Sequence, residues 1–104
     1  MKLEILAEAE QDLLDGIRFY ERQSPGVGRY FLESLSADIR SLNKFAGIHA
    51  RERGYYRMFA KRFPFAVYYR VKDDRILVHA VLDCRRNPAW IRSQLSHRQS
   101  RSES

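Results

Sequence analysis

The spacing of apolar residues changes at Gly47, and this change does most to limit how the chain can fold. From residue 9 to residue 42 they recur every three or four positions, as on one side of a helix. After Gly47 they alternate with polar residues, as in a strand. The chain has 104 residues, the usual size of one domain. A helical part followed by a strand-rich part predicts an α+β fold, with helices packed on a sheet.

The first part of the chain predicts one short strand and two helices. Residues 3–7 alternate as a strand does, and residues 9–20 then carry a helical apolar stripe. Ser24 and Pro25 mark the start of the second helix, because a serine can cap it and a proline fits its first turn. The short link between the two helices predicts an antiparallel hairpin. The second stripe consists of Val27, Phe31, Leu35, Ile39 and Leu42.

The second part predicts three strands. An alternating run comes first, and two apolar runs follow it, separated by a turn at Asp73-Asp74. The last run is almost wholly apolar, so we expect it inside the sheet with both faces covered. The three strands cover about residues 55–61, 65–71 and 76–82.

A short helix is expected to close the domain. Asn87 and Pro88 repeat the signal for a helix start, and the helix should end near Leu95. The polar residues 96–104 are expected to form a disordered tail. The predicted order is β-α-α-β-β-β-α. An N-terminal strand and an antiparallel helical hairpin packed on a small antiparallel sheet precede the C-terminal helix, in one domain over residues 1–95.

The net charge of +6 is distributed unevenly. Residues 1–43 hold five Lys and Arg against eight Asp and Glu, a balance of −3, and residues 44–104 hold fourteen against five, a balance of +9. This polarity favours a basic surface that faces a polyanion or an acidic protein. The alternative is that the arginines only keep a small protein soluble.

Several classes of protein and site do not fit the sequence. The one cysteine, Cys84, cannot form an internal disulfide, and a reducing cytoplasm is the expected compartment. His49, His79 and His97 lack the spacing of a zinc site, so we expect neither a metal nor another cofactor. His79 fits a packed strand histidine better than a catalytic base. Residues 1–9 carry acids unlike a signal peptide, and no apolar run is long enough for a membrane span.

Two segments carry a resemblance to a known family. Residues 63–70 read FPFAVYYR, and after a charged turn residues 78–88 read VHAVLDCRRNP. This order resembles the C-terminal half of ParE-type toxins, in which FPYxxxYR, an aliphatic strand and RR-(D/N)-P follow one another. The resemblance to the RelE/ParE superfamily covers about residues 1–95.

The resemblance implies a cytoplasmic toxin of a type II toxin-antitoxin system. RelE-type members are ribosome-dependent mRNA endonucleases, whereas ParE-type members act on DNA gyrase. Both are neutralised in a hetero-oligomer by an antitoxin whose extended segment wraps the toxin. We expect a ParE-like toxin that causes growth arrest by binding gyrase, with a ParD-like antitoxin as partner. The alternatives are a RelE-like mRNA endonuclease and a plain nucleic-acid-binding module.

The residues of a RelE-like nuclease are mostly missing. Cleavage of RNA by its 2′-OH needs a base, an acid and cations. The positions of the family's arginine, tyrosine and histidine fall here on Ala66, Arg92 and Asp83, and only Arg86 matches a cationic position. We therefore expect no catalytic residues and a binding toxin rather than an enzyme. If the chain is an mRNA endonuclease, Arg57 and Arg86 are the candidates.

Two sets of residues are expected to make the contacts. The target surface is assigned to the cations and the aromatic after the last strand, although one arginine could instead pair with Asp83 and the Trp could be a core anchor. These residues are Arg85, Arg86, Trp90, Arg92 and Arg98. The antitoxin is expected to contact the hairpin and the adjacent sheet edge through a stripe that also serves the core. That stripe is Leu13, Ile17, Tyr20, Phe31 and Leu35.

Overall fold

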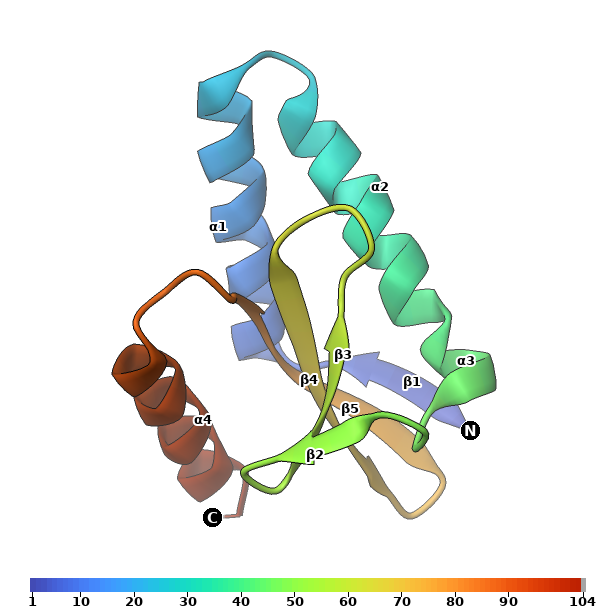
Figure 1. Cartoon of the computed structure of the whole chain (residues 1–104). Coiled ribbons are helices and arrows are strands. Elements are labelled where there is room, and N and C mark those ends of the chain that lie inside the picture. The colour runs from blue at the N-terminus through green and yellow to red at the C-terminus, as the bar shows by residue number, and fades with distance from the viewer. Residues whose placement is uncertain (104) are drawn as a thin grey trace.

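The computed structural model describes the backbone of residues 1–103 and the side chains of residues 1–98. It confirms the α+β class, the helical hairpin and the helix that follows the last strand (Figure 1). The elements are β1 (Lys2–Ile5), α1 (Ala7–Gln23), α2 (Val27–Arg40), α3 (Leu42–Phe45), β2 (Ala50–Glu52), β3 (Tyr55–Phe59), β4 (Phe65–Lys72), β5 (Arg75–Asp83) and α4 (Pro88–Glu103).

The sheet has five strands in the order β1-β5-β4-β3-β2. The three predicted strands β3, β4 and β5 pair antiparallel as expected, whereas the N-terminal strand β1 runs parallel to β5, with Leu3 beside Ile76. In sequence, the helical hairpin separates β1 from the other strands. Because this connection is long, β1 can pair with the sheet in either direction. Strand β2 was not predicted. It is a three-residue edge strand, and its mixed, exposed residues give no alternation to detect.

Strand β5 lies inside the sheet, as predicted, and seven consecutive residues of it are buried. Its two faces meet different neighbours. Ile76, Val78 and Val81 pack into the main core with α1 and α2, while Ala80 and Leu82 pack into a smaller cluster with Leu95 of α4. The sheet is therefore the middle layer, with the hairpin on one face and α4 on the other (Figure 1).

The two hairpin helices approach each other closely at two glycines. A Cβ on Gly16 would lie 2.5 Å from the Phe31 ring, and one on Gly28 would lie 2.7 Å from the Ile17 carbonyl oxygen. These distances are below van der Waals contact, so neither position can hold a larger residue without a shift. Close approach explains Gly16, whose presence otherwise only weakens a helix.

The link between the helices differs from the prediction. Ser24 ends α1, and the N-cap of α2 is Gly26, which has a left-handed backbone. The carboxylate of Glu21 accepts hydrogen bonds from the amides of Gly26 and Gly28 and so does the capping expected of Ser24. A carboxylate at a helix N-terminus is also favoured by the helix dipole.

Helix α4 is longer than predicted. It begins at Pro88, where the Asn87 side chain accepts a hydrogen bond from the Ala89 amide at 2.7 Å, as the cap signal indicated. Its backbone stays helical to Glu103, so the predicted end near Leu95 is wrong. The reason is that Arg98 is anchored to α1, and this long-range contact outweighs the polar composition of the segment.

Candidate functional site

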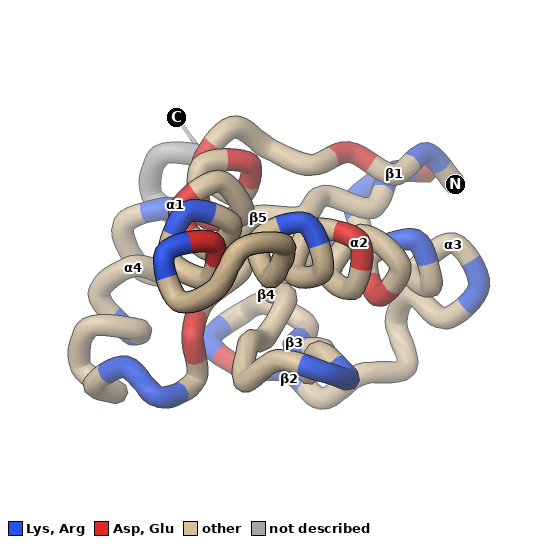
Figure 2. The backbone as a smooth tube through the Cα atoms, turned by 90° about the horizontal axis from the view of Figure 1, so that it is seen from above, with Lys and Arg blue, Asp and Glu red and all other residues tan. Residues whose placement is uncertain are grey.

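Helix α4 separates two grooves. The first, here the α1 groove, encloses about 500 Å³ between α1 and α4, and its walls include Asp15, Phe19, Arg86 and Trp90. The second, here the β3 groove, encloses about 410 Å³ between α4 and the strands β2 and β3. The loop that enters α4 carries two consecutive arginines, which form a basic segment of the backbone there (Figure 2). Both grooves are open to solvent and each includes arginines.

The last strand ends in a compact arginine–aspartate turn. Arg85 donates to both carboxylate oxygens of Asp83, at 3.0 Å from Nε and 2.8 Å from Nη2, and its amide donates to Oδ1 at 2.8 Å. These bonds hold the pKa of Asp83 below its usual value. Of the two arginines considered for pairing with Asp83, Arg85 is the partner. The pair is exposed, so it fixes the loop rather than the fold.

Arg86 is held differently. Its guanidinium lies 3.8 Å above the centre of the Trp90 ring, a cation–π geometry. Among residues whose side chains the structure describes, no carboxylate forms an ion pair with Arg86. Trp90 is partly buried and packs on the cluster under α4, so it is both an anchor and a groove wall. An unneutralised cation on a fixed aromatic is suited to contacting an anionic or aromatic partner.

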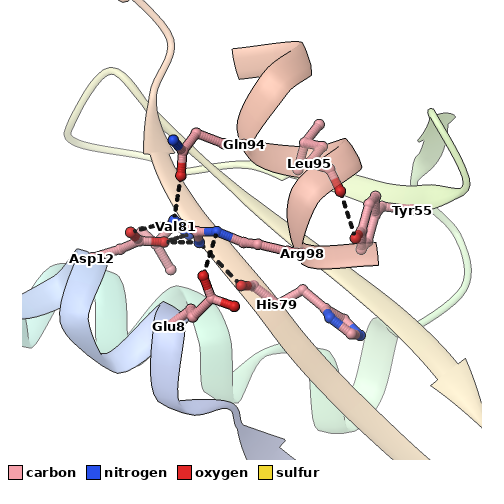
Figure 3. Close-up of polar contacts among 8 residues, drawn as sticks. All are labelled: Glu8, Asp12, Tyr55, His79, Val81, Gln94, Leu95 and Arg98. Atoms are coloured by element: carbon pink, nitrogen blue, oxygen red, sulfur yellow. Dashed lines mark hydrogen bonds and ion pairs between the residues drawn. The ribbon is translucent and has the colours of Figure 1, made fainter. Parts of the chain in front are cut away.

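Arg98 does not belong to this surface. It was expected among the target-binding cations, but its side chain is only 7% exposed. It donates to both carboxylate oxygens of Asp12 on α1, to the His79 carbonyl oxygen at 3.2 Å and to the Gln94 amide oxygen at 3.0 Å (Figure 3). Glu8 adds an ion pair at 3.6 Å. Arg98 therefore holds α4 against α1.

Asp12 completes this buried contact. Its Oδ2 also accepts a hydrogen bond from the Val81 amide of β5 at 2.9 Å. Burial raises the pKa of Asp12, against the hydrogen bonds from Arg98 and Val81, which lower it. One carboxylate thus joins α1, β5 and α4, and we call Asp12, Arg98 and Glu8 the α4 clamp. Local sequence patterns could not predict this contact, because Asp12 and Arg98 are far apart along the chain.

The stripe expected to bind the antitoxin mostly serves the core. Leu13, Phe31 and Leu35 are at most 7% exposed, and Ile17 and Tyr20 are partly buried against the same core. The first three therefore offer no free surface to a partner. The exposed apolar side chains of the hairpin are neighbours of the stripe, namely Leu14, Phe19, Tyr30 and Leu32.

The two arginines proposed for a nuclease do not meet. Arg57 lines the β3 groove and Arg86 lines the α1 groove, so α4 lies between them. Ala66 is fully buried. His79 lines neither groove. It is buried beside Tyr55 and Arg70, and burial, with the nearby Arg70 and Arg98, lowers its pKa to about 4. Among the described side chains, no group of three His, Cys, Asp or Glu could hold a metal ion.

Comparison with known proteins places the chain in a family. Residues 3–88 match the family model of the ParE toxin of the type II toxin-antitoxin system parDE. The chain belongs to the ParE toxin family. A solved structure described as the chromosomal ParDE toxin-antitoxin system from P. aeruginosa has the same fold. Its TM-score is 0.68 at 22% identity, over 78% of this chain and 92% of that one. No curated protein matches the sequence.

The family match leaves out nearly all of helix α4 of this ParE toxin. It ends at Pro88, the first residue of α4, so Trp90, Arg92 and the Arg98 anchor lie beyond it. Within the part of the toxin that the structure describes, no helix has the length and apolar character needed to cross a bilayer.

Tyr20 links the helical hairpin of the toxin to the sheet side and to the loop before α4. Its ring lies 5.2 Å from Phe31 and 4.8 Å from Phe63, and its hydroxyl accepts a 3.5 Å hydrogen bond from Arg85. Burial raises the pKa of its hydroxyl, so the group stays protonated at neutral pH. Phe63 was noticed only within the family motif, and the structure gives it a contact role between the hairpin and the sheet.

Proposed function

We propose that this ParE toxin arrests growth by binding DNA gyrase, without catalysing a reaction, and that a ParD-like antitoxin neutralises it in a cytoplasmic complex. The surface that binds gyrase would be the β5–α4 corner, defined here as Asp83, Arg85, Arg86 and Trp90. Arg92, also expected at the target surface, lines the β3 groove instead. The family match supports a toxin of a toxin-antitoxin system, and gyrase is the target that the resemblance to ParE-type toxins implies.

The observation that carries this proposal is the Arg86–Trp90 stack. An exposed cation with no carboxylate partner among the described side chains, fixed on a ring at the edge of a groove, is prepared to contact a partner at little entropic cost. Tryptophan and arginine are enriched among residues that dominate protein interfaces. Arg85 supports the stack by fixing the loop through Asp83.

The α1 groove is the surface we assign to the antitoxin, together with the exposed apolar side chains of the hairpin. One wall carries Asp15 and Phe19 of α1, and the other carries Arg86 and Trp90. An extended segment lying there would cover Arg86 and Trp90 directly. Neutralisation would then follow from occupying the surface that gyrase needs.

Binding is favoured over mRNA cleavage by the position of the candidate groups. Arg57 and Arg86 line different grooves, which disfavours their joint action on one phosphate. The histidine with the most strongly lowered pKa, His79, is buried away from both grooves. Proton transfer to a substrate needs a group within hydrogen-bond reach of it.

The test is a pair of assays with the full-length toxin. We expect purified toxin to inhibit supercoiling by gyrase, and a ParD-like antitoxin from the neighbouring reading frame to reverse the inhibition. Primer extension on mRNA from intoxicated cells should show no cleavage at ribosomal A-site codons. Codon-specific cleavage together with unaffected gyrase would overturn the proposal in favour of the endonuclease.

A further inference from the structure

The β3 groove has the features of an anion site, although neither the proposed gyrase contact nor the antitoxin contact uses it. Its lining includes Arg53, Arg57 and Arg92 against one carboxylate, that of Glu52. These four charges leave an excess of two positive charges in a groove of about 410 Å³. The arginines come from β3, from the turn before it and from α4, so only the folded chain brings them together.

Arg57 is the best-positioned cation of the groove. Its Nη1 donates to Glu52 at 3.0 Å, and its guanidinium lies 4.8 Å from the centre of the Phe59 ring. Its Nε is buried, and no acceptor among the described residues meets it. The side chain is therefore fixed in place, and because 29% of it remains exposed, other edges of its planar guanidinium can meet phosphate oxygens.

The other polar groups of the groove are neutral donors. Burial raises the pKa of the Tyr68 phenol, and the positive charge of Arg57 opposes that rise only in part. Burial and the nearby Asp83 also raise the pKa of the Cys84 thiol. Both groups stay protonated at neutral pH, so neither adds a negative charge that would repel an anion.

An aromatic side chain stands beside these cations. Phe59 is 60% exposed although it lies at the end of a strand and under Arg57. An exposed ring next to fixed cations is the arrangement with which proteins hold a nucleotide, since the base stacks and the phosphate pairs with the cation. An anion that has no aromatic ring, such as sulfate or a simple carboxylate, would make no use of the exposed Phe59 ring.

We propose that the β3 groove binds the phosphate group of a nucleotide, with Arg57 and Arg92 on the phosphate and the base on Phe59. This site lies across α4 from Arg86 and does not depend on the gyrase proposal, so either can fail without the other. Inorganic phosphate shares the same chemistry and is the alternative source.

The experiment is an NMR titration of the full-length toxin with thymidine 5′-monophosphate and, separately, with inorganic phosphate. We expect saturable shifts of amides in β2, β3 and the first turns of α4, and tighter binding of the nucleotide. Phe59→Ala should weaken only the nucleotide. Equal affinity for both probes would overturn the nucleotide assignment, and no saturable binding of either would overturn the site.

Arginine variants separate a built site from general charge attraction. Arg57→Gln should weaken nucleotide binding about tenfold or more, the usual effect of losing a charge-assisted hydrogen bond. Arg92→Gln changes an exposed side chain and guards against misfolding of the first variant, and it should also weaken binding. The matched control is Arg29→Gln, an exposed arginine on α2 paired with Glu33, which removes the same charge elsewhere. Equal weakening by the control and by Arg57→Gln would overturn the proposal.

Discussion

The two faces of the sheet are covered in different ways. The face under α1 and α2 is closed by an apolar and aromatic layer, in which Phe31 and Leu35 are fully buried and two glycines allow close helix contact. The face under α4 has a smaller cluster, a buried ion pair and two open grooves. The contrast indicates that the hairpin side supplies most of the stability, and the α4 side is where we propose the contact with gyrase.

Phe31→Ala is the change expected to have the largest effect on this comparison. Phe31 packs against Tyr20, Phe63 and Phe65 with ring centres 5.0 to 5.2 Å apart. Its loss should lower the free energy of unfolding by about 4 kcal/mol, as for other buried aromatics cut to alanine. Urea denaturation measures this. A loss below about 1 kcal/mol would mean that the hairpin face is not the main core.

Asp12→Ala tests the α4 clamp. It leaves the Arg98 guanidinium buried without its carboxylate partner, which should cost about 3 kcal/mol. The double variant Asp12→Leu with Arg98→Met should recover most of that loss, because it removes both buried charges and leaves only the partly exposed Glu8 without its partner Arg98. If both variants lose the same amount, the clamp acts through packing alone and not through charge.

The acid side of the stability curve should depend on His79. Its folded pKa, lowered to about 4 from 6.5, means that the unfolded chain binds a proton over this range while the folded chain does not. Stability present above pH 6.5 is therefore lost as the pH falls toward 4, by roughly 2 to 3 kcal/mol. His79→Gln should flatten this part of the curve in urea denaturation at stepped pH. An unchanged slope would show that His79 is already charged in the folded state.

Tyr55→Phe should have the smallest effect. The Tyr55 hydroxyl donates to the Leu95 carbonyl oxygen at 3.1 Å and so ties α4 to β3. Removing it should cost about 1 kcal/mol. Amide hydrogen exchange should become faster in α4 and stay unchanged in α2. Faster exchange throughout the chain would contradict separate stability of the two faces.

The sequence predicted what local spacing encodes. The hairpin, the interior position of β5 and the Asn87 cap each follow from neighbours in the chain, and the structure has all three. It could not predict contacts between distant residues. The Asp12–Arg98 pair, the parallel pairing of β1 and the closure of the core over Phe31 depend on how the elements meet in space.

For the same reason, the sequence could not tell which residues of the candidate site are available to a partner. Composition located a basic region after β5, but it treated Arg85, Arg86 and Arg98 as equivalent. The structure separates them into a cation paired with Asp83, a cation stacked on Trp90 and a buried anchor. The residue type determines the charge of a side chain, whereas its availability to a partner depends on burial and on nearby carboxylates.

The most direct test of the account compares two double variants that remove equal charge. Arg85→Ala with Arg86→Ala alters the β5–α4 corner, and Arg29→Ala with Arg40→Ala alters exposed positions on α2. The measured quantity is the toxin concentration that halves supercoiling by gyrase, with thermal unfolding as a check on folding. We predict a rise of at least about thirtyfold for the first variant, the scale of an interface hot spot, and little change for the second. Full inhibition by a folded Arg85→Ala, Arg86→Ala toxin would contradict the account.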